Sequence, residues 1–182
     1  SLLDIDHGSY PFVTSSNSTI GGALTGTGLV PSDINNIIGI FKAYSTRVGE
    51  GPFPSEIDKS DLVAKHLLEK GHEFGTTTGR ERRCGWFDVS SAKHSIMTNG
   101  FNKIAIMKLD VLDGLSEIKV LNNSINNQYD VLPGWKNSTF GITDYKDLPA
   151  NAKKYLKYLE EKIDVEISMI STGPERDQTI VI

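Results

Sequence analysis

KIAIMKLD, residues 103–110, is the stretch that decides the fold, because an apolar run ends directly in a lysine and an aspartate. Its first five residues are short, apolar and rich in strand-forming side chains, which predicts a buried β-strand. A second such run, EISMI at residues 166–170, passes directly into Ser171-Thr172-Gly173. In parallel α/β sheets, ligands bind beyond the carboxyl ends of the strands. We therefore expect these two polar segments to contribute to one ligand site.

Apolar residues at helical spacing alternate with these strands along the chain. The clearest helix is predicted from Pro149 to about residue 162, with one apolar stripe and a proline suited to the first helical position. Other helices are expected at 34–48, 61–70 and 89–98, further strands at 116–121 and 179–182, a strand end at 1–6, loops over 7–33 and a polar turn at 121–130. This alternation favours an α/β fold with a mostly parallel sheet and flanking helices.

The bulk composition excludes several classes of protein. The chain has 182 residues, of which 38% are hydrophobic and 23% charged, as in an ordinary globular domain or part of a larger one. Its net charge of −4 argues against a broad basic surface for nucleic acid. No apolar run approaches the roughly 20 residues needed to cross a bilayer. The single cysteine excludes an intrachain disulfide, so we expect a reducing compartment and no membrane or nucleic-acid partner.

The Lys-x-Asp sequence after the first strand has a specific chemical interpretation. The carboxylate of Asp110 can accept two hydrogen bonds from the ring N–H and exocyclic amine of guanine, and adenine offers no such pair. The stem of Lys108 can lie over the base, and the loop at 171–173 can approach it with backbone N–H groups. The alternative is that Lys-x-Asp occurs by chance at a solvated strand end.

GTTTGRERR, residues 75–83, combines hydroxyls, glycine-flanked backbone N–H groups and guanidinium groups. This set suits carboxylates and phosphates, and arginine adds bidentate geometry. The alternative is a solvated turn in which Arg82 and Arg83 pair with nearby acids. The hydroxyl-rich segment 10–19 could likewise hold a phosphate or a sugar, or form a plain turn-rich loop.

Three further features are expected to be structural. Asp4, Asp6 and His7 could be metal ligands, but His7 would point away from the other two on a strand. His66 lies on the apolar face of an expected helix and is interpreted as a packed histidine. Cys84 is expected to be a small buried residue.

Several long motifs together resemble one family. DIDHGSYPFVTSSN, KAYSTRVGEGPFPSE, GHEFGTTTGRERRCGWFD, KLDVLDGL and ISTGPERDQTI occur in the same order in adenylosuccinate synthetase. The resemblance covers nearly the whole chain but only the C-terminal part of that enzyme. It implies that residues 1–182 are the C-terminal part of a single domain, whose parent fold is P-loop-NTPase-like and is truncated here at the N-terminal side. The segment 121–131 is shorter than in typical bacterial members.

The family joins inosine monophosphate (IMP) to L-aspartate, using GTP as co-substrate and Mg²⁺. The resemblance implies phosphorylation of the purine 6-oxygen and then displacement of that phosphate by the aspartate amine, within a cytoplasmic homodimer in purine nucleotide synthesis. Two alternatives stay open. One is a phage-type relative that aminates a guanine deoxynucleotide, and the other is a nucleotide-binding module without chemistry of its own.

The resemblance also implies roles for individual residues. Glu81 stands where the family often has a basic residue. No catalytic residue or metal ligand is expected in this chain, because the general base, the general acid and the Mg²⁺ ligands would lie upstream of Ser1, so we expect the chain alone to be inactive. The aspartate-binding residues would be Thr76, Thr77, Thr78, Gly79, Arg80, Glu81 and Arg82; the IMP-binding residues Thr14, Val48 and Arg80; and the GTP-binding residues Arg82, Lys108, Leu109, Asp110, Ser171, Thr172 and Gly173.

Overall fold

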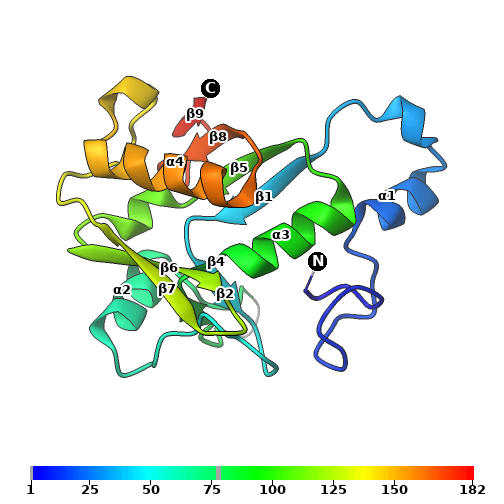
Figure 1. Ribbon diagram of the computed structural model, residues 1–182, viewed down its shortest axis with the longest axis horizontal. Coiled ribbons are helices and arrows are strands. Elements are labelled where there is room, and N and C mark those ends of the chain that lie inside the picture. The colour runs from blue at the N-terminus through cyan, green and yellow to red at the C-terminus, as the bar shows by residue number, and fades with distance from the viewer. Residues whose placement is uncertain (1, 77–78) are drawn as a thin grey trace.

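A computed structural model describes residues 2–76 and 79–182. Its main sheet has four strands in the order β1-β5-β8-β9 (Figure 1). These strands are β1 (Ile38–Lys42), β5 (Lys103–Met107), β8 (Ile167–Ser171) and β9 (Thr179–Val181). β1 is parallel to β5 and β5 is parallel to β8, whereas β9 returns antiparallel to β8. The predicted α/β fold with a mostly parallel sheet is confirmed.

Two smaller sheets lie beside the main one. β2 (Ser45–Arg47) pairs antiparallel with β3 (Arg83–Gly85), and β4 (Phe87–Asp88) pairs parallel with β6 (Glu117–Asn123). β6 then forms an antiparallel hairpin with β7 (Gln128–Pro133). The expectation of a turn over 121–130 was therefore too broad, because only the middle of that segment is a turn and its two ends belong to strands.

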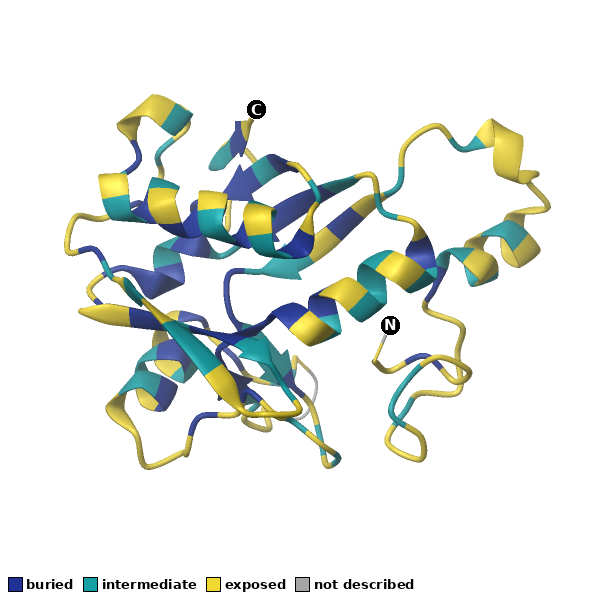
Figure 2. Cartoon of the chain, in the orientation of Figure 1, coloured by how far each residue is buried: buried dark blue, intermediate teal, exposed yellow. Residues whose placement is uncertain are grey.

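Helices α2 (Leu62–Lys70), α3 (Val89–Asn99) and α4 (Ala150–Ile163) confirm three of the expected helices, and α4 crosses one face of the main sheet (Figure 1). Its apolar stripe faces inward while its outer face is exposed (Figure 2). The hydroxyl of Tyr155, fully buried, donates to the Ala43 carbonyl at 2.6 Å. Pro149 occupies the N-cap position, one residue earlier than predicted. Short 3₁₀ turns are η1 (Pro31–Asp33), η2 (Leu109–Leu112) and η3 (Tyr145–Asp147).

The helix expected at 34–48 is wrong, because this segment forms β1 and β2. The isoleucines that recur at helical spacing are β-branched residues, which favour strands. Gly39 would cost a helix interior about 1 kcal/mol, but in β1 it lets the ring of Phe101 approach. A Cβ on Gly39 would lie 2.5 Å from that ring. Pairing with β5 then provides hydrogen-bond partners along one edge of β1.

The loop expected over 7–33 contains a helix that was missed, α1 (Ile20–Thr27). None of its residues is buried. Its first amide, Ile20 N, donates to Oδ1 of Asn99 at the end of α3, at 2.9 Å. A side chain distant in sequence therefore satisfies an amide that a helix start normally leaves without a partner, and no local pattern reveals this.

The strand end expected at 1–6 is also wrong, because the described part of that segment forms turns. The buried carboxylate of Asp4 accepts hydrogen bonds from the backbone N–H groups of Asp6, His7 and Ser18. Asp4 therefore organises the loop, in agreement with the structural role preferred for it. Among the described residues, no group of three or more His, Cys, Asp or Glu side chains could hold a metal ion.

Candidate functional site

Three strands of the main sheet bring their carboxyl ends to the same edge. Lys42 at the end of β1 is opposite Met107 at the end of β5, and Ile106 is opposite Ile170 near the end of β8. The segments 108–110 and 171–173 therefore follow neighbouring parallel strands. The two polar segments therefore lie at the same edge of the sheet, and their contribution to one ligand site stays a prediction.

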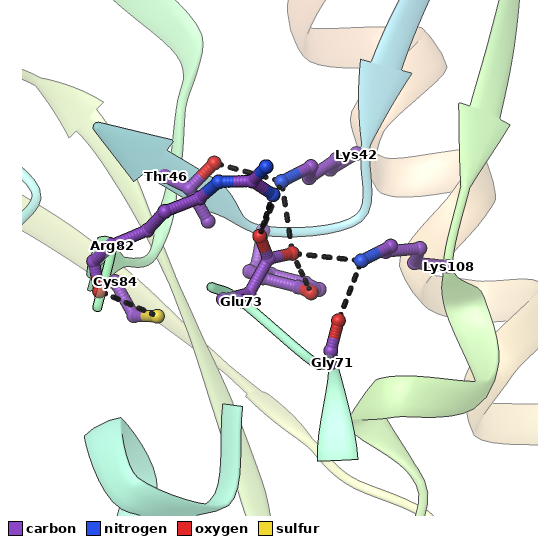
Figure 3. A network of polar contacts seen from close by, with 8 residues as sticks. Lys42, Thr46, Gly71, Glu73, Arg82, Cys84 and Lys108 are labelled. Carbon is purple, nitrogen blue, oxygen red and sulfur yellow. Dashed lines mark hydrogen bonds and ion pairs between the residues drawn. The ribbon is translucent and has the colours of Figure 1, made fainter. Parts of the chain in front are cut away.

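A fully buried carboxylate, Glu73, lies beside this edge and joins several polar side chains (Figure 3). It lies in the loop that follows α2. Lys42 Nζ donates to its two carboxylate oxygens at 2.8 and 2.9 Å, and Lys108 Nζ to Oε1 at 2.9 Å. Arg82 Nη1 donates to Oε2 at 2.7 Å, and the Tyr44 hydroxyl donates to Oε1 at 2.6 Å. We call Glu73, Lys42, Arg82 and Lys108 the Glu73 cluster.

Further contacts fix the two lysines of the Glu73 cluster. Lys42 also donates to Thr46 Oγ1 at 2.8 Å, and Lys108 donates to the Gly71 carbonyl at 2.6 Å. Burial alone would raise the pKa of Glu73, but the hydrogen bonds from the surrounding donors outweigh it and lower that pKa to about 2. Burial, and then the hydrogen bond to Glu73, raise the pKa of Tyr44. Three cations thus surround one ionised carboxylate.

Residues 73–75 and 79–82 lie side by side, because Arg82 N donates to the Glu73 carbonyl at 2.9 Å. Phe74 and Glu81 form an antiparallel bridge, and Gly75 N donates to the Arg80 carbonyl at 2.8 Å. Gly79 has a positive φ of 63°, a backbone conformation that residues other than glycine rarely adopt. Among the sequence-predicted residues of this loop, Thr76, Gly79, Arg80 and Glu81 are exposed, while Thr77 and Thr78 lie outside the described residues.

The predicted guanine-reading residues lie directly after β5. Lys108 has a positive φ of 62° and is the N-cap of η2. Leu109, the first residue of η2, is completely buried and therefore packs in the core. Asp110 is half-buried. Burial raises its pKa, and the nearby charge of Asp113 acts in the same direction, while Lys70 and Lys108 oppose it.

The segment 171–173 is held by its own contacts. Thr172 is completely buried, its N–H donates to the Gln178 carbonyl at 3.0 Å, and its hydroxyl donates to the Ile142 carbonyl at 2.8 Å. The Ser171 hydroxyl donates to the Gly173 carbonyl at 2.9 Å. Thr172 thus fixes the shape of the loop with its polar groups.

A second buried carboxylate, that of Asp113, stabilises the segment that contacts this loop. Asp113 accepts hydrogen bonds from Trp135 Nε1 at 2.6 Å, Ser138 Oγ at 3.0 Å, Thr139 N at 2.7 Å and Thr139 Oγ1 at 2.8 Å. The chain beyond Thr139 then contacts the 171–173 loop, where Gly141 N donates to the Thr172 carbonyl at 3.1 Å. Asp113 therefore connects the end of η2 to the loop that follows β8.

A cavity of about 570 Å³ adjoins the Glu73 cluster. Its lining includes Lys42, Thr46, Val48 and Arg82, so two residues with predicted ligand roles, Val48 and Arg82, share one space. Thr14 is exposed, and its hydroxyl donates to the Leu3 carbonyl at 2.9 Å. The structure brings Arg82 and Lys108 together on Glu73, and it places Val48 on the same cavity as Arg82.

Sequence reasoning missed Glu73, Lys42 and Tyr44. Lys42 was hidden because its segment was expected to be helical, and Glu73 because it stands among polar residues of a loop. A signal was available in GHEFG, residues 71–75, where an acid stands among ring-bearing and glycine residues just before the predicted anion-binding motif. His66 is partly buried, and its Nε2 lies 2.8 Å from the Val111 carbonyl, in agreement with a packing role. Cys84 is buried as expected.

Comparison with known proteins identifies the family. The family described as adenylosuccinate synthetase matches residues 1–180. The chain belongs to the adenylosuccinate synthetase family. It is 50% identical over 199 aligned residues to the adenylosuccinate synthetase of Psychrobacter sp. (strain PRwf-1) and 51% identical to that of Thermodesulfovibrio yellowstonii. These alignments cover 100% and 99% of this chain but 46% of each relative, so the chain spans about half the length of the curated relatives it matches.

Solved structures agree with this assignment. A fully ligated adenylosuccinate synthetase from Plasmodium falciparum superposes with a TM-score of 0.94 at 38% identity, covering all of this chain and 48% of that one. A cyanophage S-2L succinoaminodeoxyadenylate synthetase, bound to dGMP and dATP, matches with a TM-score of 0.63 at 18% identity, covering 99% of this chain and 43% of that one. The second likeness concerns the fold alone.

Among the described residues, no helix is long and apolar enough to cross a membrane.

Proposed function

We propose that this chain is the C-terminal part, within a single domain, of an enzyme that joins L-aspartate to IMP at the expense of GTP, giving adenylosuccinate. The observation that carries the proposal is the meeting of the 108–110 and 171–173 segments at one sheet edge beside the Glu73 cluster. The full-length enzyme would be a cytoplasmic homodimer of purine nucleotide synthesis. Its partners are small molecules rather than nucleic acid or membrane.

The guanine end of GTP is assigned to the segments after β5 and β8. The carboxylate of Asp110 would accept hydrogen bonds from the two N–H donors of guanine, and the stem of Lys108 would lie along the base. Leu109 lies between them in sequence and is buried in the core, so it would anchor the backbone that carries both side chains. Ser171, Thr172 and Gly173 would close over the base, in a loop whose shape is set by the Thr172 hydrogen bonds.

The anionic groups of the substrates are assigned to the loop and the cavity next to it. Arg82 would face the GTP phosphates, Arg80 would lie between aspartate and the IMP ribose, and Val48 and Thr14 would contact the IMP ribose and phosphate. The cavity lined by Val48 and Arg82 supports a nucleotide at this position. The aspartate carboxylates would be held by residues 76–82, namely Thr76, Thr77, Thr78, Gly79, Arg80, Glu81 and Arg82.

The reaction would proceed in two steps. The 6-oxygen of IMP takes the terminal phosphoryl group of GTP, which leaves GDP, and the aspartate amine then displaces that phosphate from C6 and loses a proton. Mg²⁺ is expected in the parent enzyme, but the residues described here do not fit it. Three cations already occupy the carboxylate of Glu73, and no acidic group of three or more is available. Its ligands, and the acid and base, are assigned to the remainder of the parent enzyme.

The phage-type alternative is less well supported. The chain is 38% identical to the Plasmodium falciparum enzyme and 18% identical to the cyanophage protein. A nucleotide-binding module without chemistry is the second alternative, and it shares the GTP site. These alternatives separate by ligand, because IMP, a guanine deoxynucleotide and GDP each test a different one.

Isothermal calorimetry of the chain with GDP and ADP tests the guanine assignment. We expect GDP to bind more tightly than ADP, and Asp110→Ala to remove this preference, since charge-assisted bonds in a desolvated site contribute about 1.5–3 kcal/mol each. Equal binding of GDP and ADP by the unmodified chain would refute the assignment. A coupled assay with IMP, aspartate and GTP tests the expected inactivity of the chain alone, and product formation would overturn it.

A further inference from the structure

Glu73 has no part in the assignments above, although five of the hydrogen bonds described at the site end on its carboxylate. Its carboxylate is completely buried, and it receives donors from Lys42 at the end of β1, from Arg82 and from Lys108, the residue after β5. Lys42 and Lys108 are more than thirty residues away from Glu73 along the chain. A single side chain therefore determines where the cations of the site stand relative to one another.

The charge of the Glu73 cluster exceeds what burial of one carboxylate requires. A buried carboxylate needs a charged partner and saturated hydrogen bonding, and one lysine with the Tyr44 hydroxyl would supply both. Lys42, Arg82 and Lys108 bring three positive charges against one negative charge, and like charges at this separation repel. The surplus of two positive charges is therefore suited to a second anion.

The surplus charge is directed toward open space. The side chains of Lys42 and Arg82 are each 27% exposed and that of Lys108 is 35% exposed, while that of Glu73 is 0% exposed. Lys42 and Arg82 both line the cavity of about 570 Å³. Figure 3 shows the three cationic side chains converging on Glu73 from different sides. The carboxylate is thus the fixed centre, and the cations form the part that a ligand can reach.

We propose that Glu73 is a positioning residue that holds Lys42, Arg82 and Lys108 as one preformed cationic group for a phosphate-bearing nucleotide, and that Lys42 is a further anion-binding residue of this group. This inference rests on the proposed function for the identity of the nucleotide. One carboxylate then links the guanine side of the site, through Lys108, to the phosphate side, through Arg82. Preformed geometry of this kind reduces the ordering that binding would otherwise require.

The decisive variant is Glu73→Gln, which keeps the shape of the side chain and removes its charge. With GDP as the probe, we expect calorimetry to show affinity at least about tenfold weaker, as is typical when a supporting residue of a binding site is lost. Glu73→Asp keeps the charge and should recover part of the affinity. Glu56→Gln is the matched control, because Glu56 also pairs with an arginine, Arg83, in the adjacent β3 and is given no ligand role. It should leave GDP affinity unchanged.

A second readout does not depend on nucleotide. Ammonium groups held in hydrogen bonds exchange slowly, so ¹⁵N NMR of the lysine side chains should show the Nζ signals of Lys42 and Lys108 in the unmodified chain. Both signals should be lost or shifted in Glu73→Gln and kept in Glu56→Gln. If Glu73→Gln does not fold, Lys42→Met replaces it as the test. We expect Lys42→Met to weaken GDP binding while leaving the preference for GDP over ADP in place.

The outcomes separate the two ideas. If the unmodified chain binds no GDP, the proposed GTP site in this chain is overturned. If it binds GDP and folded Glu73→Gln binds GDP equally well with unchanged lysine signals, Glu73 is not a positioning residue. Unchanged GDP affinity in Lys42→Met overturns the role given to Lys42.

Discussion

Glu73 and Lys108 form an ion pair at 2.9 Å, although one follows α2 and the other follows β5. The pair connects the loop that follows α2 to the strand end that carries Asp110, the residue proposed to read guanine. The Glu73 side chain is 0% exposed and the Lys108 side chain is 35% exposed, so the negative partner is internal and the positive partner reaches solvent. This asymmetry underlies the first prediction.

Acid should weaken the fold through Glu73. The pKa of Glu73 is about 2 in the folded chain against an ordinary value of 4.5. Below pH 4.5 Glu73 becomes protonated in the unfolded chain but stays ionised in the folded chain. The free energy of unfolding therefore falls until the pH reaches about 2. Urea unfolding at several pH values should show a smaller acid loss in Glu73→Gln than in the unmodified chain. Equal acid losses in the two proteins would contradict this account.

GDP affinity should decline in acidic solution because of Asp110. Its carboxylate must be ionised to accept both guanine donors, and burial raises its pKa above the ordinary 3.8. Affinity should therefore be full at neutral pH and should fall as the pH approaches that raised value from above. Calorimetry over a pH series measures this, and Asp110→Asn should remove the pH dependence together with most of the affinity. A pH dependence that persists in Asp110→Asn would assign it to another group.

Replacing Asp113 should strongly destabilise the protein. Its buried carboxylate accepts four hydrogen bonds, and Asp113→Ala leaves donors of Trp135 and Thr139 without partners. We expect a loss of about 3–5 kcal/mol in the free energy of unfolding, measured by urea titration with tryptophan fluorescence. The exposed pair of Glu161 with Lys157 gives a control, since Glu161→Ala should cost no more than about 0.5 kcal/mol. A loss below about 1 kcal/mol for Asp113→Ala would show that the segment 135–139 relaxes freely.

Cys84 should react slowly with thiol reagents in the folded chain. It is buried, and burial followed by the charge of Glu73 raises its pKa to about 11, so the reactive thiolate is scarce at neutral pH. A chromogenic disulfide reagent should modify the single thiol slowly in buffer and quickly in urea. Rapid modification in buffer would mean that the region around β3 opens readily.

The sequence alone predicted the elements whose patterns are local. KIAIM and EISMI are short apolar runs bounded by polar residues, and each forms a strand of the main sheet. Helix α4 carries its own stripe of apolar residues, and helix α2 its own cap, since the Asp61 carboxylate accepts from Val63 N at 2.8 Å. The resemblance of the motifs likewise predicted the family to which the comparisons assign the chain.

Elements that depend on partners distant in sequence were not predicted from the sequence. The isoleucines of β1 recur at helical spacing and so predict a helix, but pairing with β5 stabilises the strand form. Helix α1 was missed because the cap of its first amide is Asn99, at the end of α3. In both cases the partner that satisfies the backbone lies more than sixty residues away along the chain.

The site divides in the same way. The amino-acid sequence by itself indicated Lys108, Asp110 and Arg82 as candidate binding residues, from their residue types and spacing. Only the tertiary structure decided that Lys108 and Arg82 meet Lys42 on the buried carboxylate of Glu73. The physical reason is that a carboxylate withdrawn from water must gather its counter-charges from whatever segments the fold brings within hydrogen-bonding distance, and sequence spacing does not record which segments those are.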